Sequence, residues 1–467
     1  MTPAAATAYI WQLGGGTLSS LDSVALRGQE PALPSTFAVG TMAQATIAAS
    51  ALAAAEFAVA RRNGRQLAAV DMRHAATEFR SEQLLSVEGQ PERRIWDKVA
   101  GVYQTGDGRY VRVHANMPHH RARTLAFLKA EYERESVARK LQDWTGEALE
   151  TAAAENGMVI TMMRTPEEWR AHPQGQALAT LPLFEIIRIG DAPPRQRLPS
   201  ERPLSGIRAL DLTRVIAGPV CGRTLAAHGA DVLSITGPGI PDMPTLVMDG
   251  GRGKLRAELD LASEDGRAKL KALAKSADIF IQGYRPGALA AKGFSPEAIA
   301  EISPGIVVVS LSAWSHAGPW AGRRGFDSLV QNANGLNAAE AAAAGVQGPK
   351  ELPCQALDHG SGFLMATGAM MALKRQAEEG GSWLVRVSLA QTGEWLWKLG
   401  RLPAETLALP APKAGDLGDL LELSGSGFGA MTAVRHAGLL SETAPRFTRP
   451  SMPLGSHAAE WPQSAVA

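Results

Sequence analysis

The chain has 467 residues, about three times the length of a typical domain, which predicts about two or three domains with sizeable cores. Hydrophobic residues make up 45% of the sequence, charged residues make up 20%, and the formal net charge is +1. This balance is that of an ordinary soluble protein, and it excludes a global electrostatic field for nucleic acid or a membrane surface. Any polyanionic ligand must therefore be bound by a local basic patch.

The cysteines and the N-terminus indicate a cytoplasmic protein. Cys221 and Cys354 are the only cysteines, and neither belongs to a CxxC or Cys/His metal-binding pattern. The starting sequence "MTPAAATAYIWQLGGG" lacks the basic region of a signal peptide, and the apolar stretch 47–60 is interrupted by Glu56. We therefore expect a location in the reducing cytosol, no membrane span and no nucleic-acid partner.

Both ends of the chain have a less regular composition than its centre. Residues 1–94 are expected to form an N-terminal segment with an irregular Ala/Gly/Ser/Pro-rich lead-in over 1–35. A helix over 37–60, a short strand and another helix follow. Residues 401–467 are rich in Pro, Ala and Gly, and we expect them to form a loosely ordered C-terminal tail.

Residues 95–204 are expected to form a small α+β domain followed by a linker. "VYQTGDGRYVRVHA" is typical of a β-hairpin that turns at its Gly-Asp-Gly. Helices are expected to follow, and one begins at "TPEEW", where Thr165 and Glu168 can form a capping box around Pro166.

Residues 205–400 carry the most regular pattern. The strand-like runs "IRALDLT", "ADVLSI", "DIFIQG" and "GIVVVSLS" alternate with helix-like segments such as "EDGRAKLKALAKSA". Because the strands are nearly continuous apolar runs, the pattern predicts a parallel sheet covered by helices on both faces. We therefore expect an α/β fold with a doubly wound parallel-sheet domain, whose ligands bind beyond the carboxyl ends of the strands.

The loops after three of these strands are the candidate ligand-binding segments. They read "RVIAGP", "YRPG" and "AWSHAGPW", and each combines a Gly-Pro or Pro-Gly turn with basic or aromatic residues. The chain contains neither the GxGxxG dinucleotide fingerprint nor the GxxxxGK[ST] phosphate loop. The predicted pocket is therefore of another kind.

Six segments in series resemble the motifs of the family III coenzyme A transferases, also called CaiB/BaiF-like proteins. They are "LDLTRVIAGPVCGRTLAAHGADVL", "GRGKLRAELDL", "ADIFIQGYRPGAL", "SLSAWSHAGPW", "RRGFDSLVQ" and "ALDHGSG". The resemblance covers about residues 205 to 400 and implies a CoA-binding catalytic domain. It implies a transferase that moves coenzyme A from an acyl-CoA thioester to a carboxylic acid, with both as small-molecule substrates and with no covalently bound cofactor.

Asp358 precedes a long Ala/Met-rich run that predicts a buried helix. From the residues alone two roles are open, because Asp358 or Ser361 can cap this helix and Asp358 can also act on a substrate. In the family that the chain resembles, the carboxylate at the place of Asp358 is the nucleophile and forms aspartyl covalent intermediates with the acyl group and with CoA. Gly360 and Gly362 would let backbone and substrate approach closely. His359 is expected to be mainly a neighbour.

The phosphates of coenzyme A require positive charge, and the resemblance implies which residues surround the ligand. The implied CoA-binding residues are Arg214, Val215, Ile216, Ala217, Lys254, Tyr284, Arg285 and Arg324. For each Arg or Lys taken alone, a solvated surface position is the alternative.

Three histidines near the end of the predicted hairpin, His114, His119 and His120, raise the question of a metal site. No acid or cysteine stands at a useful spacing from them. We therefore expect no metal here, and a loop that faces either the substrate or an interface.

The residue before Asp327 separates two reactions of the family. The racemases carry there a His that acts as an acid/base, whereas this chain has Phe326, which cannot move a proton. Transfer is therefore favoured, and Asp327 is expected to be structural, as a cap of the following helix. Two alternatives stay open: a racemase or isomerase that uses Asp358 with a different base, such as His359 or His316, and a non-catalytic acyl-CoA-binding protein.

The N-terminal segment repeats the order of the region around Asp358. Residues 43–79 and 360–396 both run from an Ala-rich helix through a basic residue and a turn to a strand and a second helix. This predicts an internal duplication whose first copy is catalytically empty, because no acid occurs between Ala32 and Ala55. By resemblance, the small domain follows the CoA domain in ordinary members, so the order is reversed here, and a homodimer of the interlocked kind is implied.

Overall fold

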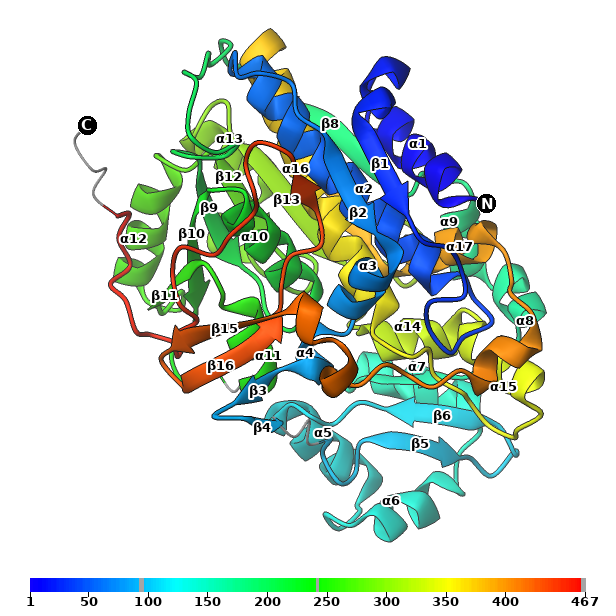
Figure 1. Ribbon diagram of the computed structural model, residues 1–467. Helices are drawn as coiled ribbons and strands as arrows, with labels where there is room; N and C mark the ends of the chain where they lie inside the picture. The colour runs from blue at the N-terminus through cyan, green and yellow to red at the C-terminus, as the bar shows by residue number, and fades with distance from the viewer. Residues whose placement is uncertain (92–95, 241–242, 463–467) are drawn as a thin grey trace.

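The computed structural model of the protein describes residues 1–91, 96–240 and 243–462 (Figure 1). Its central element is a seven-stranded sheet with the order β11-β10-β9-β12-β13-β14-β8. Neighbouring strands from β11 to β14 pair in parallel, and β8 pairs antiparallel with β14 at one edge. The strands are β8 (Phe184–Gly190), β9 (Arg208–Leu212), β10 (Asp231–Thr236), β11 (Lys254–Glu258), β12 (Ile279–Gln282), β13 (Val307–Ser312) and β14 (Ser382–Ser388).

Helices cover both faces of this sheet. Ile279 and Ile281 of β12 belong to the core shared with α10 and α16, whereas Phe280 between them belongs to the core shared with α12 and α13. This alternation fits a strand that is buried on both faces, so the expected doubly wound α/β fold is confirmed. The helices of this part are α10 (Ala217–Ala227), α11 (Pro244–Gly250), α12 (Glu264–Ala274), α13 (Pro296–Ile302), α14 (Asp327–Ala333), α15 (Leu336–Ala344), α16 (Ala356–Glu379) and α17 (Leu389–Leu399), with a 3-10 turn at Ala290–Lys292.

The strand order places a switch point between β9 and β12. Chain order proceeds from β9 outward to β11 on one side and from β12 to β14 on the other. At such a point the loops that leave adjacent strands diverge, and a crevice opens beyond the carboxyl ends.

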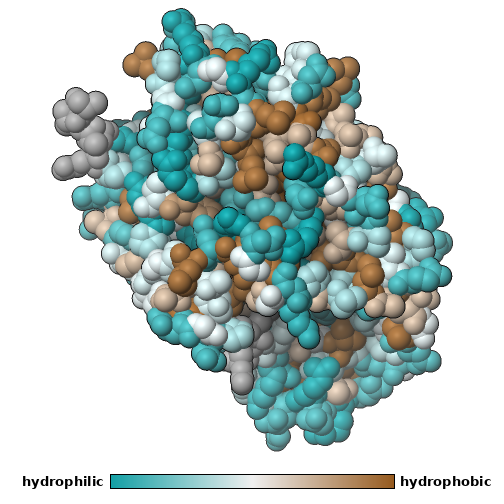
Figure 2. Space-filling model, viewed as in Figure 1, coloured by the Kyte–Doolittle hydropathy of each residue, from teal (hydrophilic) through white to brown (hydrophobic). Residues whose placement is uncertain are grey.

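Helix α16 runs through the centre of the protein. Nearly all of its residues up to Leu373 are buried, and it packs against α2 (Val39–Ala60) along much of its length (Figure 1). By length and composition α2 could cross a membrane, but 89% of its apolar window is buried inside the fold. The apolar surface of α2 is therefore used in the core. On the face shown in Figure 2, groups of hydrophobic residues lie among hydrophilic ones.

The N-terminal segment is more regular than its composition predicts. The expectation of an irregular lead-in over residues 1–35 is wrong, because α1 and β1 form there. Helix α1 begins with a local signal, since the Thr2 hydroxyl accepts from the Ala5 N–H and Pro3 occupies the first position. The elements are α1 (Pro3–Leu13), a 3-10 turn (Leu18–Ser23), β1 (Val24–Arg27), α2, β2 (Ala68–Asp71), α3 (Met72–Glu78), α4 (Ser81–Leu84), β3 (Ser86–Val87) and β4 (Gln90–Pro91).

The order α2–β2–α3 matches the order α16–β14–α17, as the predicted duplication requires. Order and helix packing are shared by many unrelated units, so the duplication stays a prediction.

A small three-stranded sheet follows the N-terminal segment. The predicted hairpin is confirmed as β5 and β6, and the capping box of Thr165 and Glu168 begins α8. The sequence predicted that residues 184–190 belong to the small domain. They instead form β8 at the edge of the large sheet, because they pair with β14. The elements are β5 (Gly101–Gln104), β6 (Tyr110–Val113), α5 (Pro118–Leu128), α6 (Arg134–Leu141), α7 (Gly146–Glu155), β7 (Ile160–Met162), α8 (Pro166–Ala171) and α9 (Pro173–Ala179).

The C-terminal residues are also ordered, and the expectation of a loose tail over 401–467 is wrong in the part that the structure describes. β15 and β16 pair with each other, β16 pairs with β3, and β17 pairs with β2. These partners lie near the other end of the chain, so local composition could not indicate them. The elements are β15 (Leu421–Ser426), β16 (Gly429–Val434), β17 (Leu439–Leu440) and 3-10 turns at Ala404–Ala408, Ala414–Asp416 and Gly418–Leu420.

A buried ionic cluster joins these N- and C-terminal elements to the large sheet. Arg223 of α10 is completely buried and contacts Asp249 of α11 and Glu78 of α3, with a 3.5 Å separation from Glu78. His436, which follows β16, lies 3.0 Å from the same Glu78 carboxylate. Burial alone would raise the pKa of Glu78, but the charges of His436 and Arg223 and the hydrogen bonds from His436 and the Ala437 N–H outweigh it and hold that pKa well below its usual range.

We expect Glu78→Gln to lower the free energy of unfolding by about 3 kcal/mol at pH 7, because it leaves the buried Arg223 charge incompletely balanced. Urea unfolding measures this loss. Because folding lowers the pKa of Glu78, the free energy of unfolding of the wild type should fall by a similar amount as the pH falls below about 4.5. The variant, which has no carboxylate at this position, should not show this loss. Glu301→Gln, the same change at an exposed position of α13, should alter neither quantity; equal behaviour of the two variants would contradict the assignment.

Candidate active site

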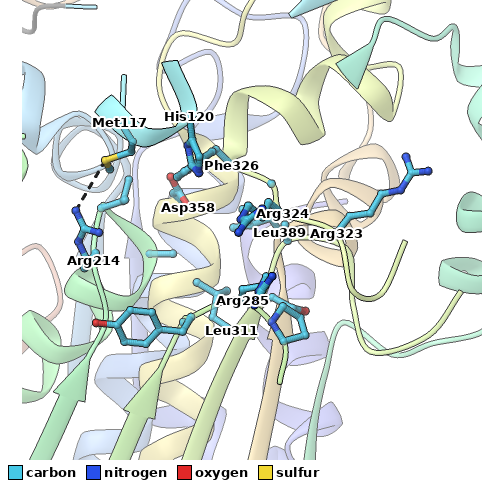
Figure 3. A pocket seen from close by; sticks show the side chains of 18 of the residues that line it. Met117, His120, Arg214, Arg285, Leu311, Arg323, Arg324, Phe326, Asp358 and Leu389 are labelled. Carbon is cyan, nitrogen blue, oxygen red and sulfur yellow. Dashed lines mark hydrogen bonds between the residues drawn. The ribbon is translucent and has the colours of Figure 1, made fainter. Parts of the chain in front are cut away.

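The loops after β9, β12 and β13 open on one cavity of about 250 Å³. It lies where the strand order reverses, as the sequence predicts for a doubly wound sheet. Asp358 lines this cavity, together with six of the predicted CoA-binding residues: Arg214, Val215, Ala217, Tyr284, Arg285 and Arg324 (Figure 3). The tertiary structure therefore brings together residues that are separated by up to about 140 positions in the chain.

Asp358 is the third residue of α16 and is only 7% exposed. Its backbone N–H donates to Oδ2 of Asp327 at 2.9 Å. The residue before the helix, Gln355, makes no side-chain cap, and the hydroxyl of Ser361 lies 2.7 Å from that of Thr392. Asp327 thus satisfies an N–H of the first turn from outside the helix, and the Ser361 hydroxyl is paired with Thr392.

Asp327 has a different role from the one that the sequence predicts. It is the first residue of α14, but its carboxylate accepts from the start of α16, so it caps a helix from outside rather than its own. Gln331 also donates to it. Burial raises the pKa of Asp327 to about 6, against the opposing effect of these hydrogen bonds.

Close backbone packing holds the start of α16 against the start of α10. A Cβ on Gly362 would lie 2.5 Å from the carbonyl oxygen of Ala217 and 2.7 Å from Cβ of Val220, so only glycine fits there. Val215, in the loop before α10, has a φ of 73°, a costly conformation for a β-branched residue. The main chain beside the cavity is therefore fixed by packing and by a strained turn.

Arginine side chains give the cavity its charge. Arg285, Arg323 and Arg324 line it, and none of them has a carboxylate within 4 Å in residues 1–91, 96–240 and 243–462. Burial lowers the pKa of Arg324, and the nearby Arg285 and Arg123 lower it further. Unbalanced positive charge in a partly buried cavity favours an anionic ligand.

A second, smaller cavity of about 110 Å³ adjoins the first and shares these three arginines. Trp314 and Trp320 form part of its wall. Arg323 lies over the Trp320 ring at 4.6 Å from the centroid, which orients its guanidinium. The two cavities together offer a charged recess beside Asp358.

Two predicted CoA-binding residues lie elsewhere. Lys254 is completely buried, and its Nζ donates to Oδ2 of Asp211 at 2.7 Å and to the carbonyl oxygen of Pro219 at 2.9 Å. It is therefore part of an internal ion pair and is not available to a phosphate in this structure. Ile216 is 5% exposed and lies outside the cavity lining, so its side chain contributes to the core.

The two histidines proposed as alternative bases do not line the cavity. His359 is completely buried, lies 3.0 Å from Glu82 and stacks on Phe79. His316 is partly exposed and faces Glu185 at 3.6 Å. Neither of the two histidines that were named as examples of an alternative base therefore lies in the cavity with Asp358.

The start of α5 lies in the wall of the same cavity and supplies Met117, His119 and His120. The hairpin-end histidines thus include two that face the cavity, which was one of the two expectations for this loop. His114 instead stacks on Phe326, with ring centroids 3.9 Å apart. Within the described residues no three His, Cys, Asp or Glu side chains are grouped as metal ligands.

Comparison with known proteins gives matches over the same part of the chain. Residues 204–408 match the sequence model of CoA-transferase family III. An acetyl-coenzyme A transferase of Hypoxylon pulicicidum is 30% identical over 320 residues, 64% of this chain and 54% of that protein. Human succinyl-CoA:glutarate CoA-transferase is 32% identical over 155 residues, 31% of this chain and 35% of that protein.

A crystal structure of a hypothetical protein from Mycobacterium tuberculosis is 28% identical, with a TM-score of 0.40 over 43% of this chain and 58% of that chain. The chain thus spans about half the length, or less, of the curated relatives named above.

We expect Asp327→Asn to become more stable relative to the wild type as the pH rises from about 4 to about 7. The folded-state pKa of about 6 exceeds the ordinary 3.8, so the wild type holds an extra proton between these values and loses stability as it dissociates. The difference amounts to at most about 3 kcal/mol, since each pH unit is worth about 1.4 kcal/mol. Urea unfolding at pH 4.5 and 7.5 measures it, with Asp143→Asn as the exposed control; parallel profiles for Asp327→Asn and wild type would refute it.

Proposed function

We propose that the protein moves coenzyme A from an acyl-CoA thioester to a carboxylic acid, as the match of residues 204–408 to CoA-transferase family III suggests. The observation that carries the proposal is the position of Asp358. Its carboxylate stands at the start of a buried helix, in a cavity that is also lined by Arg285 and Arg324.

In the proposed reaction Asp358 is the nucleophile. Its carboxylate oxygen attacks the thioester carbon, the carbonyl electron pair moves to oxygen, and collapse expels the CoA thiolate to leave an aspartyl anhydride. The thiolate attacks the aspartyl carbon, giving an aspartyl thioester and the free donor acid. The acceptor carboxylate and the thiolate then repeat these steps to form the new acyl-CoA and regenerate Asp358.

Burial supports this role because a poorly solvated carboxylate is a stronger nucleophile than a hydrated one. The Asp358 N–H donates a hydrogen bond to Asp327, so Asp327 caps the start of α16. The same bond fixes the backbone that carries the proposed nucleophile. Phe326 stands against the cavity where a proton-transfer residue would be needed for racemisation, so the transfer reaction is the better supported one.

The proposed CoA-binding surface consists of the loop before α10 and the arginines. Val215 and Ala217 contribute backbone at the beginning of α10, where N–H groups favour an anion. Arg214, Arg285 and Arg324 supply the positive charge, and Tyr284 supplies an aromatic edge beside them. The recess at Trp314 and Trp320 is the proposed place of the acid that leaves or enters.

Relatives suggest which substrates to test. Their names specify acetyl-CoA, succinyl-CoA with glutarate, and formyl-CoA with oxalate. All are acyl-CoA thioesters or carboxylic acids of small size, so this class is proposed for the present chain.

We expect an acyl-CoA donor with hydroxylamine to convert Asp358 to a hydroxamate, because hydroxylamine captures activated carboxylates. Intact-protein and peptide mass spectrometry detects the adduct after incubation with acetyl-, formyl- or succinyl-CoA. Asp358→Asn should abolish it, while Asp327→Asn, which keeps the nucleophile, should still be labelled. Binding of the donors without any adduct in the wild type would leave the non-catalytic acyl-CoA-binding protein as the better description.

We expect Arg285→Met to weaken CoA binding about 10-fold to 100-fold, because a charge-assisted hydrogen bond to phosphate contributes about 1.5 to 3 kcal/mol. Isothermal titration calorimetry with free CoA measures the loss, which should be smaller at higher ionic strength. Arg139→Met, at an exposed position of α6, is the matched control and should bind as the wild type does. Equal affinities for Arg285→Met and wild type would remove Arg285 from the binding surface.

A further inference from the structure

The side chain of His120 is the most unusual polar group in the cavity wall. His120 is the third residue of α5, is 5% exposed and lines the cavity together with Asp358 (Figure 3). It comes from the small unit that precedes the family III domain, outside residues 204–408. Neither the proposed nucleophilic attack nor the proposed CoA contacts use it.

The imidazole of His120 has no hydrogen-bonding partner in the described part of the chain. Its Nδ1 is fully buried and unpaired, and its ring contacts are aromatic, with His119 at 4.2 Å and Phe326 at 6.1 Å between centroids. Buried polar groups in folded proteins are nearly always hydrogen-bonded, because leaving one unpaired costs about 1 to 3 kcal/mol. Because Nδ1 is buried inside the wall, Nε2 is the ring nitrogen that a ligand in the cavity can reach, and we expect the ligand to be its hydrogen-bonding partner.

Position and surroundings keep this ring uncharged. Burial lowers the pKa of His120 to about 3, and the positive charges of His119, Arg324, Arg123 and Arg214 act in the same direction. Above about pH 4 the ring is thus a neutral imidazole with one N–H donor. A protonated ring would form an ion pair with a carboxylate nucleophile and weaken it, whereas a neutral ring does not.

A neutral imidazole at a helix N-terminus is well suited to polarise a carbonyl group. The helix end disfavours the imidazolium, so the ring donates a hydrogen bond without transferring its proton. The apolar side chains of Phe326 and Met117 in the same wall lower the local dielectric, which strengthens such a bond. His119, on the same turn, is exposed and therefore a weaker candidate.

We propose that His120 is a catalytic residue whose neutral imidazole N–H donates a hydrogen bond to the acyl carbonyl oxygen when Asp358 attacks. The proposal rests on the proposed transferase function. As the bond from Asp358 to the carbonyl carbon forms, the carbonyl π pair moves to oxygen, and the His120 N–H stabilises that oxyanion. The pair returns when the thiolate leaves, and the imidazole keeps its proton throughout.

The test compares two substitutions of similar size. His120→Gln keeps an N–H donor, and His120→Leu removes it. In single-turnover experiments with whichever of acetyl-, formyl- and succinyl-CoA labels the wild type, the rate of hydroxamate formation on Asp358 should fall about 100-fold to 1,000-fold in His120→Leu. His120→Gln should recover at least about 10-fold of that loss, and the Kd for free CoA should change by less than about 3-fold in both.

A second measurement does not depend on turnover. In an Asp358→Asn background, the carbonyl stretching frequency of the bound acyl-CoA should be lower with His120 present than with His120→Leu, because the hydrogen bond weakens the C=O bond. His120→Met, whose flexible side chain fills irregular space, replaces His120→Leu in both measurements if the latter does not fold.

Different results overturn different statements. If the wild type is labelled and the apolar variants are labelled within about 3-fold of its rate, or the carbonyl frequency does not respond, the role of His120 is wrong and the transferase proposal stands. A rate for His120→Gln no higher than for His120→Leu also overturns the role of His120. If no donor labels the wild type, the transferase proposal fails and the role of His120 fails with it.

Discussion

The N-terminus of α16 imposes the constraint on which the candidate site depends. A helix of 24 residues that is buried on nearly all sides must begin inside the protein, where its first N–H groups cannot reach water. Asp327, from another helix, accepts the N–H of Asp358. Because this need is met from outside, Asp358 can present its carboxylate to the cavity without serving as the cap.

The segments on either side of residues 204–408, the region that matches CoA-transferase family III, complete its core. α2 lies along α16, Glu82 contacts His359 directly behind the nucleophile, and Glu78 joins Arg223 to His436. These contacts link the beginning and the end of the chain to the helix that carries Asp358. The small unit adds the wall formed by α5, so the cavity is built from parts that are far apart in the chain.

Charge in the cavity is divided between groups with distinct tasks. Arg285, Arg323 and Arg324 favour an anionic ligand. Phe326, which cannot transfer a proton, lies in the same wall. His120, the buried one of the two histidines in the wall, is held neutral by burial and by the surrounding positive charge. A neutral imidazole cannot form an ion pair with the Asp358 carboxylate.

The sequence alone determined the alternation of apolar strands and helices, the doubly wound sheet, the loops that would form a pocket, and Asp358 as the residue to test. These features follow from the local periodicity of apolar residues and from the order of the motifs, and both can be recognised in the sequence without a structure. Lys254 shows what motifs cannot predict. Its place in a motif predicted a contact with the ligand, but it forms a buried ion pair with Asp211, which lies 43 positions earlier in the chain. The ordered C-terminal strands, the external cap by Asp327 and the approach of His120 to the cavity were decided only by tertiary structure, since each depends on a partner that is distant in the chain.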